Sequence, residues 1–263
     1  MPLAMSSRLT VVLLALMLGI QPVSTDLYLP TLPILTQEFG APMSQVHMTL
    51  SALLLAFGIS QLFWGPLSDM WGRRPVLILG LTAFIVAGVG CVLAPSIDAL
   101  IIWRTLQGAA MGSVVVCARA IVRDLYTPEA GVRVMSKALT GLGVLACLST
   151  PIGALLTQIY SWHAALGAIV VFGALCLTAV VWRYQESAPN ITGAIPSAKE
   201  LARTWWQILR HPTFIAFACL ALASYGGLFV FLVSSSFVFM GVVGLNKLEY
   251  GLLMCSMAFV YIL

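Results

Sequence analysis

Charged side chains are scarce in this sequence. Its 13 Lys and Arg and nine Asp and Glu make up only 8% of 263 residues, whereas a soluble domain carries about 25%. Hydrophobic residues reach 60%, and the mean hydropathy is +1.01. A soluble protein of this size cannot bury so much apolar surface, because most residues of a small globule contact water. The composition excludes a soluble enzyme, a nucleic-acid-binding protein and a disordered chain, and it indicates a polytopic membrane protein.

Cysteines at metal-binding or disulfide spacing are also missing. The six cysteines lie far apart within apolar runs, and no C-x-x-C pair occurs. A zinc site or a disulfide framework needs closer, repeated spacing. We therefore interpret the cysteines as small packing residues. The sequence predicts no metal site, no cofactor and no catalytic residue.

Long apolar runs determine the predicted fold class. A spanning helix needs about 20 residues, and the runs do not alternate as barrel strands do. The predicted fold is thus an all-α membrane protein, a polytopic helical bundle. The runs cover residues 9–36, 46–67, 75–95, 98–120, 133–158, 164–184 and 213–239, and a shorter one begins at 248.

One polar stretch, residues 185–211, divides the chain into parts. We predict a six-span bundle over 1–184, a cytoplasmic linker over 185–211, and the start of a second, incomplete bundle over 212–263. In the second half of the linker, Leu201 and Trp205 share a helix face while basic residues lie elsewhere. This pattern predicts a short helix at the membrane interface.

The distribution of basic residues predicts the orientation. Of the 13 Lys and Arg, all except Arg104 and Lys247 fall on the same side of the predicted spans as the N-terminus. Lys and Arg collect in cytoplasmic loops. We expect a multi-pass protein with a cytoplasmic N-terminus, in contact with the lipid bilayer and not with nucleic acid.

Asp26 is an acid within the first apolar run. A carboxylate there costs about 2.5–3.5 kcal/mol on translocon scales, so it is usually buried against a partner or a watery cavity. Pro22, Pro30 and Pro33 lie nearby and bend the helix, as is common beside transport sites. We predict an acid that binds a proton or a cation; the alternative is a structural hydrogen bond.

Arg104 is a base within the fourth run. It lies close enough to the span end for its side chain to extend to the interface, which is one interpretation. The other is an inward-facing charge at a depth within about one helical turn of Asp26. We hypothesise that Arg104 lowers the proton affinity of Asp26 and that the two form a direct or water-bridged pair that switches during transport.

A polar segment between the second and third runs carries a specific pattern. Residues 65–75 read G-P-L-S-D-M-W-G-R-R-P, which we interpret as a loop. Glycine permits sharp turns and close approach, and an acid there can pair with arginine or with a helix N-terminus. The residues that define the pattern are Gly65, Asp69, Gly72, Arg73 and Arg74.

Three motifs together resemble a known family. The 65–74 pattern is similar to the gate motif G-x-x-x-D-x-x-G-R-[KR] of the major facilitator superfamily, and L-x-x-x-R-x-x-Q-G in the fourth run is similar to a second superfamily motif. D-x-Y-x-P-x-x-P in the first run resembles the signature of drug/proton antiporters. The likeness is greatest to the bicyclomycin- and chloramphenicol-resistance branch. The residues carrying the last two motifs are Arg104, Gln107 and Gly108, and Asp26, Tyr28, Pro30 and Pro33.

The resemblance implies a function and roles for these residues. It implies proton-driven export of small, largely lipophilic compounds, antibiotics among them, across a bacterial inner membrane. Asp26 and Arg104 would couple transport to protons, and the 65–74 motif would form the cytoplasmic gate. Antiporters of the family carry G-P-x-x-G-G in their fifth span, of which this sequence keeps Pro151 and Gly153. The implied partners are a small-molecule substrate and protons.

Chain length departs from the implied fold. The major facilitator fold has twelve spans in about 400 residues. The sequence provides the N-terminal six-helix half and about one and a half helices of the second. We therefore expect a truncated product, and we predict that this chain by itself does not confer efflux.

Two alternatives remain open from the residues. One is a half-size transporter that acts as an oligomer. The other is a seven-span, receptor-like protein without transport activity, although a retinal protein would need a Schiff-base lysine that 213–239 lacks.

Overall fold

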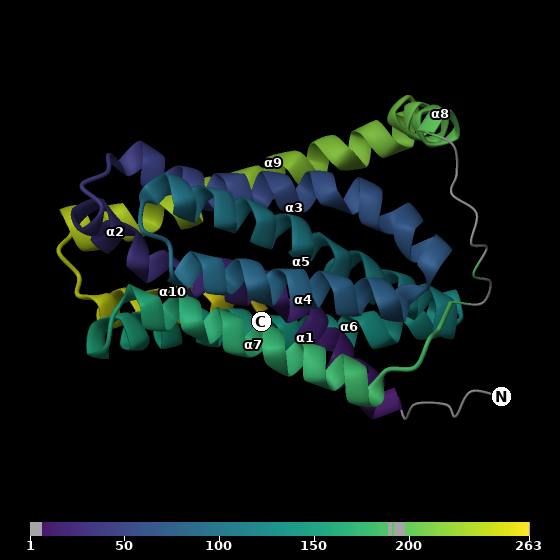
Figure 1. Ribbon diagram of the computed structural model, residues 1–263, viewed down its shortest axis with the longest axis horizontal. Coiled ribbons are helices and arrows are strands. Elements are labelled where there is room, and N and C mark those ends of the chain that lie inside the picture. Colours follow the sequence, from purple (N-terminus) through teal and green to yellow (C-terminus); the bar gives the residue numbers. More distant parts are fainter. Residues whose placement is uncertain (1–6, 189–190, 192–197, 263) are drawn as a thin grey trace.

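The computed structural model describes residues 7–188, 191 and 198–262, and the regular structure in them is helical throughout (Figure 1). Seven helical stretches are long and apolar enough to cross a membrane. The predicted all-α polytopic bundle is thus confirmed. In chain order the elements are α1 (Ser7–Asp26), η1 (Leu29–Thr31), α2 (Leu32–Glu38), α3 (Met43–Trp71), α4 (Arg73–Val92), α5 (Ile97–Leu125), α6 (Pro128–Ile159), α7 (Trp162–Arg183), α8 (Ala198–Leu209), α9 (Pro212–Ser236), the π-helix η2 (Phe237–Val242) and α10 (Lys247–Ile262).

The first six spans pack into one bundle. Helix α5 packs against both α3 and α4, α1 packs along α6, and α4 packs against α7. Helix α5 is the most deeply enclosed span, with 72% of its apolar window buried. The core therefore lies along α1 and α5, and these two helices carry the unusual charges Asp26 and Arg104.

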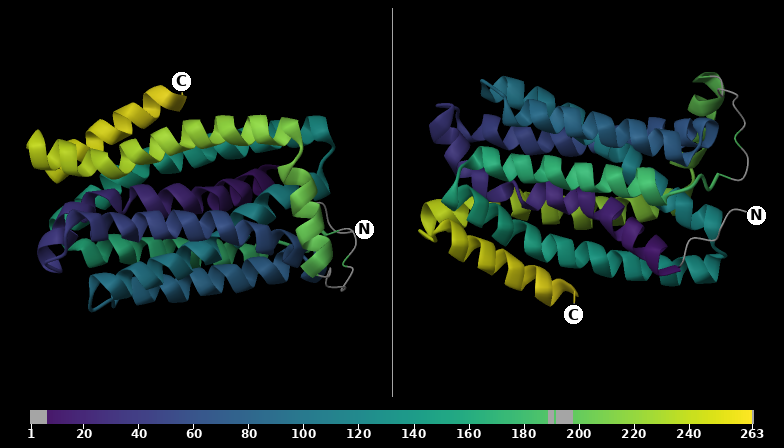
Figure 2. Two further views of the ribbon diagram at one scale, coloured as in Figure 1. Left: turned by 90° about the horizontal axis from the view of Figure 1, so that it is seen from above. Right: turned by 60° about the horizontal axis from the view of Figure 1, so that its bottom comes forward.

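Helix α9 lies at the periphery of the molecule (Figure 2). None of the apolar window of α9 is buried within the described chain, whereas α10 packs along α6. Near the loop between α2 and α3, η1 and α2 contact α9 and η2, and the rings of His47 and Phe237 lie 4.8 Å apart. The second part of the chain is therefore joined to the first at that end.

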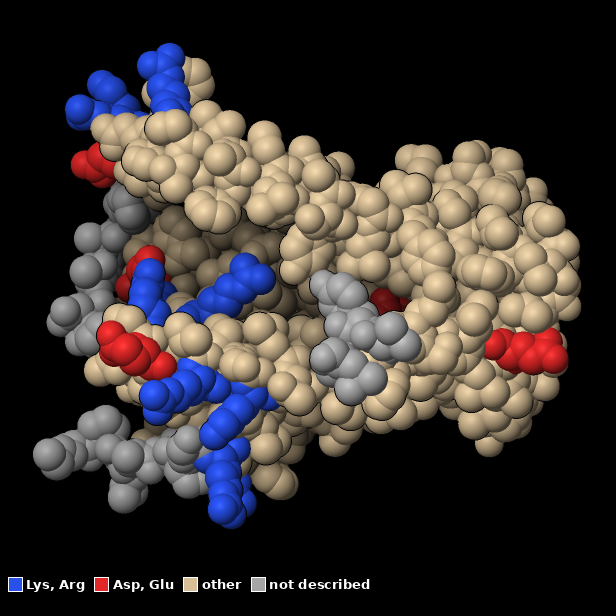
Figure 3. All heavy atoms as spheres, turned by 180° about the vertical axis from the view of Figure 1, so that it is seen from behind, with Lys and Arg blue, Asp and Glu red and all other residues tan. Residues whose placement is uncertain are grey.

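The other end of the molecule is basic and hollow. Helix α1 begins there and α3 gives way to α4 there, and Lys and Arg gather at this end in Figure 3. Figure 3 also shows a hollow between α9 and the six-span bundle that opens toward it. We call this the basic end and the other the opposite end. The basic residues at the basic end are Arg8, Arg73, Arg74, Arg119, Arg123, Arg133, Lys137, Arg183, Lys199, Arg203 and Arg210.

Two details of the predicted spans are corrected by the structure. The first span is not one helix, because α1 ends at Asp26 and the chain continues through η1 into α2. The segment 65–75 is not a loop: α3 continues through Pro66 to Trp71, and α4 begins at Arg73. Gly72 alone separates these helices, with a φ of +93° that glycine adopts without steric cost.

The linker contains the predicted short helix, α8. Part of the predicted linker, residues 189–190 and 192–197, lies outside the described residues. Figures 1 and 2 show α8 running across the direction of the spanning helices at the basic end. Such an orientation agrees with the interfacial position predicted from its sequence.

Candidate functional site

The break in the first span places Asp26 at a helix end. Pro22 lies inside α1, and Pro30 lies in η1; because proline removes a backbone donor, helical hydrogen bonding is interrupted here. The Asp26 side chain is half-buried, and its Oδ1 accepts a hydrogen bond of 2.7 Å from the Thr25 hydroxyl. Next to Asp26 in the chain, η1 contacts both α6 and α10. Asp26 therefore lies at a break in the first span that is close to both α6 and α10.

Arg104 is fully buried on α5, at 0% exposure. Its Nη1 donates to Gln107 Oε1 at 2.9 Å, and its Nη2 donates to the Ser24 carbonyl at 3.0 Å. The guanidinium carbon also lies 3.9 Å from the centre of the Tyr28 ring. Arg104 therefore faces inward and contacts the first span on both sides of Asp26, at Ser24 of α1 and at Tyr28 beyond the helix end. The interpretation that it extends to the interface is wrong.

The predicted direct pair between Arg104 and Asp26 is not present in this conformation. The ion pairs among the described residues do not include it. Residues two positions apart on a helix differ by about 200° in direction, so a guanidinium that contacts Ser24 and Tyr28 meets a different side of α1. The similar depth of the two charges was predicted correctly, but their directions were not.

Other members of the predicted motifs support this arrangement. The Tyr28 hydroxyl and Thr49 Oγ1 of α3 share a hydrogen bond of 2.8 Å, and Gln107 also accepts a weak bond from the Cys91 thiol at 3.8 Å. Pro30 is buried and Pro33 is half-buried. The first-span signature and the span-four motif therefore meet around one buried guanidinium.

Two motif glycines allow helices to touch backbone to backbone. A Cβ on Gly108 of α5 would collide with the carbonyl oxygen of Leu53, and a Cβ on Gly153 of α6 would collide with that of Leu27. Gly251 of α10 likewise approaches Pro151, whose Cα would lie 2.9 Å from an added Cβ. In a membrane such small residues permit close helix packing. Pro151 and Gly153 thus place α6 against the broken part of the first span and against α10.

Replacing Gly153 by Ala should lower the free energy of unfolding by about 1–3 kcal/mol, because a backbone atom cannot yield to the new methyl group. SDS-titration unfolding in mixed micelles measures the change. Gly167→Ala in α7 is the matched control, since nothing lies within 4 Å of its added Cβ; it should be neutral or stabilising by helix propensity. Equal effects of the two substitutions would contradict the packing role.

The gate motif forms a buried ion cluster at the basic end. The Arg73 side chain, only 3% exposed, contacts Asp69 at 2.6 Å and Asp124 of α5 at 2.9 Å. Its Nη1 also donates to Ser68 Oγ at 2.7 Å. Asp69 is 58% exposed, whereas Asp124 is 5% exposed. Asp124 is therefore the enclosed partner, and the sequence analysis did not identify it because an acid beside Arg123 resembles an ordinary span-end residue.

Glu186 is a second site residue that the sequence analysis missed. Its carboxylate accepts hydrogen bonds of 2.9 Å from the backbone N–H groups of Arg73 and Arg74, so it caps the N-terminus of α4. A Cβ on Gly72 would lie 2.5 Å from Glu186 Oε2, so the glycine leaves room for this cap. Arg74 in turn donates to the Val181 carbonyl of α7. More than a hundred residues separate Glu186 from Arg73 and Arg74, and no local pattern indicates the contact.

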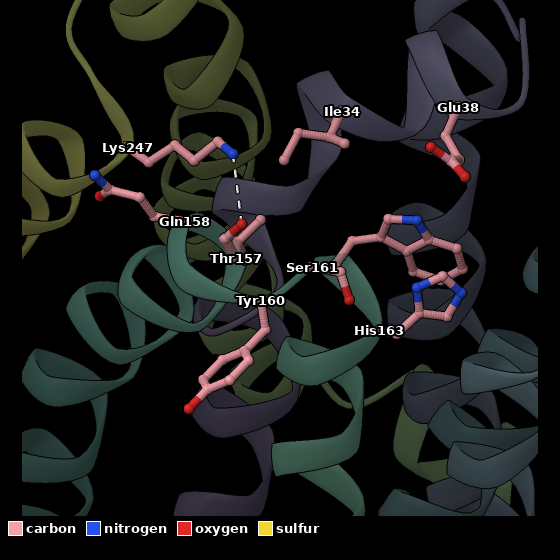
Figure 4. A pocket seen from close by; sticks show the side chains of 9 residues that line it. Ile34, Glu38, Thr157, Gln158, Tyr160, Ser161, His163 and Lys247 are labelled. Carbon is pink, nitrogen blue, oxygen red and sulfur yellow. Dashed lines mark hydrogen bonds between the residues drawn. The ribbon is translucent and has the colours of Figure 1, made fainter.

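A pocket of about 360 Å³ lies at the opposite end (Figure 4). It is lined by Glu38 of α2, the turn between α6 and α7, and Lys247 at the start of α10. Lys247 Nζ donates to the Thr157 carbonyl at 3.5 Å. In Figure 4 Glu38 and Lys247 belong to separate walls, one from each part of the chain. The pocket therefore lies where the two parts meet.

Comparisons with known proteins agree with this geometry. The family model of the Major Facilitator Superfamily matches residues 14–263. The bicyclomycin resistance protein homolog of Haemophilus influenzae is 27% identical over 94% of this chain and 62% of its own length. The chloramphenicol resistance protein of Pseudomonas aeruginosa is 29% identical over 89% and 55%, and the Escherichia coli multidrug resistance protein MdtL is 29% identical over 96% and 63%.

Solved structures show the same fold. The human organic anion transporter MFSD10 matches with a TM-score of 0.71 and 20% identity over 98% of this chain and 71% of its own. A D-xylose-proton symporter matches with a TM-score of 0.71 and 14% identity over 97% and 66%.

The chain spans about 60% of the length of the curated relatives that it matches. The resemblance to the drug-resistance branch is confirmed by the names of those relatives. Because the transporter family model matches residues 14–263, the alternative of a seven-span, receptor-like protein is not supported. The chain therefore belongs to the major facilitator superfamily.

Proposed function

We propose that the protein exports small lipophilic compounds in exchange for protons, across a bacterial inner membrane, with its N-terminus in the cytoplasm. The observation that carries this proposal is the acid Asp26 at the break of the first span, where the fully buried Arg104 contacts Ser24 before it and Tyr28 after it. Relatives named for bicyclomycin, chloramphenicol and multidrug resistance support the substrate class.

The arrangement suggests how protonation is coupled to movement. A protonated Asp26 is neutral and can remain against α6 and α10, whereas an ionised one requires a donor or a cation in the membrane. Arg104 holds a charge nearby, and its Nε is buried without a hydrogen-bond partner. Rotation of the broken segment by about half a turn would bring the carboxylate to this unused donor. The pair thus forms in one state and separates in the other.

The hollow at the basic end represents the cytoplasm-facing state in this proposal. Lys and Arg favour cytoplasmic positions, so the hollow in Figure 3 opens to the side from which drugs are collected. The contacts of η1 and α2 with α9 and η2 close the opposite side. Gly65, Asp69, Gly72, Arg73 and Arg74 then occupy the cytoplasmic gate, and alternating access reverses which end is closed.

Drug accumulation in an efflux-deficient bacterial host tests this function. We would express the 263-residue chain, and the same chain continued by the C-terminal part of the Haemophilus relative. The continued chain should lower drug accumulation in energised cells, whereas the 263-residue chain by itself should not. An uncoupler should abolish the effect. Asp26→Asn should abolish it as well, whereas Asp98→Asn, at an exposed acid in the first turn of α5, should retain it. Extrusion that persists in Asp26→Asn or without a proton gradient would contradict the proposal.

A further inference from the structure

Helix α8 has two chemically distinct faces. At 100° per residue, Leu201, Trp205, Ile208 and Leu209 fall on one side of the helix. The opposite side carries three basic residues together with Glu200 and Gln207. The basic residues are Lys199, Arg203 and, just after the helix, Arg210. This separation is typical of helices that lie within a membrane interface.

The structure places α8 where such a helix can meet the bilayer. It crosses the direction of the spanning helices at the basic end (Figures 1 and 2). The Trp205 ring meets the ring of Phe63 on α3 edge-on at 5.9 Å, so the part of the apolar face around Trp205 is held by the bundle. Ile208 and Leu209 remain 45% and 56% exposed. Part of the apolar face is therefore directed away from the protein.

The polar face carries positive charge of the kind that anionic lipid attracts. Lys199 and Arg203 are exposed, and the Arg210 guanidinium lies 4.4 Å from the centre of the Trp206 ring. Trp206 itself is 57% exposed, at the border between the two faces. Tryptophan is enriched at the level of the lipid headgroups, because its ring has an apolar body and a polar N–H group that reaches water. Trp206, with Arg210 beside it, is the kind of residue found there.

We propose that α8 binds anionic phospholipid headgroups, with the exposed Ile208 and Leu209 of its apolar face in the bilayer and Lys199, Arg203 and Arg210 on the lipid phosphates. Because α9 begins three residues after α8 and Trp205 contacts α3, this lipid contact positions the basic ends of α9 and α3, at the end of the molecule where the hollow opens. Each basic residue near an anionic surface shifts the balance between the membrane-bound and the displaced helix roughly fivefold.

Spin labels at two neighbouring positions report where α8 lies. Cysteine substitutions Gln207→Cys and Ile208→Cys would be made in the full chain with Cys219 and Cys255, the two cysteines that are not buried, changed to Ser. The chain would be reconstituted in phosphatidylcholine vesicles with and without roughly one-quarter phosphatidylglycerol. Collision with oxygen measures contact with the acyl chains, and collision with a water-soluble nickel complex measures contact with water.

With phosphatidylglycerol present, the label at 208 should be exposed to oxygen and shielded from nickel, and the label at 207 should show the reverse. Without it, or after Lys199→Gln, Arg203→Gln and Arg210→Gln, this difference should diminish. Removing the exposed charges of Arg119, Arg133 and Lys137 is the matched control and should leave it intact. The proposal is overturned if the two lipid mixtures behave alike, if the control substitutions have the same effect, or if both reagents fail to reach position 208, since a protein surface then covers it.

Discussion

Replacing Arg104 by Lys should destabilise the protein more than replacing it by Met. The guanidinium is fully buried; its two terminal nitrogens donate to Gln107 and to the Ser24 carbonyl, and its plane lies over the Tyr28 ring. A lysine ammonium keeps the charge but cannot reproduce the planar fork or the stacking. An uncompensated buried charge costs about 3–5 kcal/mol, so Arg104→Lys should lower the free energy of unfolding by about that amount.

Arg104→Met removes the charge together with its desolvation cost. It leaves two oxygen acceptors without their donor, which costs about 1–3 kcal/mol. SDS-titration unfolding of the two variants gives the order, and Leu106→Met, a half-exposed neighbour on the same helix, serves as the control. If Arg104 instead formed a stable ion pair with Asp26 in this state, Lys would be the milder replacement. A Lys variant more stable than the Met variant would therefore contradict the hydrogen-bonded arrangement.

Asp124→Asn should lower the free energy of unfolding by about 3 kcal/mol, although Asp124 lies outside the gate motif. It is the enclosed partner of the buried Arg73, and removing one partner of a buried ion pair leaves the other charge uncompensated. Asp69, which the motif does contain, is 58% exposed. Exposed ion pairs contribute about 0–1 kcal/mol, so Asp69→Asn should have a small effect.

Unfolding by SDS titration of Asp124→Asn, Asp69→Asn and Asp98→Asn distinguishes these roles. Asp98 lies exposed in the first turn of α5, at the far end of the helix that carries Asp124, and should behave like Asp69. A salt titration provides a second measure, because screening weakens the exposed pair more than the enclosed one. Equal destabilisation by Asp69→Asn and Asp124→Asn would contradict the prediction that the buried acid contributes more to the free energy of unfolding than the exposed one.

Most of the fold was predictable because apolar runs of sufficient length have few alternatives in a membrane. The seven spans, the helix in the linker and the family followed from hydropathy and motif spacing. The predictions failed where helix ends depend on neighbours. Residues 65–75 appear polar enough for a loop, yet α3 continues to Trp71, where Glu186 caps the following helix. Local sequence cannot indicate a cap supplied from more than a hundred residues away.

The sequence by itself determined the class of protein, the side on which its basic residues gather, and two charges that a membrane span rarely contains. Tertiary structure decided what those charges contact. Depth along a span follows from residue number, because a helix rises by a constant amount, but direction depends on which helices pack beside it. Arg104 therefore binds the backbone and the ring on either side of Asp26, Arg73 finds Asp124, and Gly153 allows α6 to touch the broken first span.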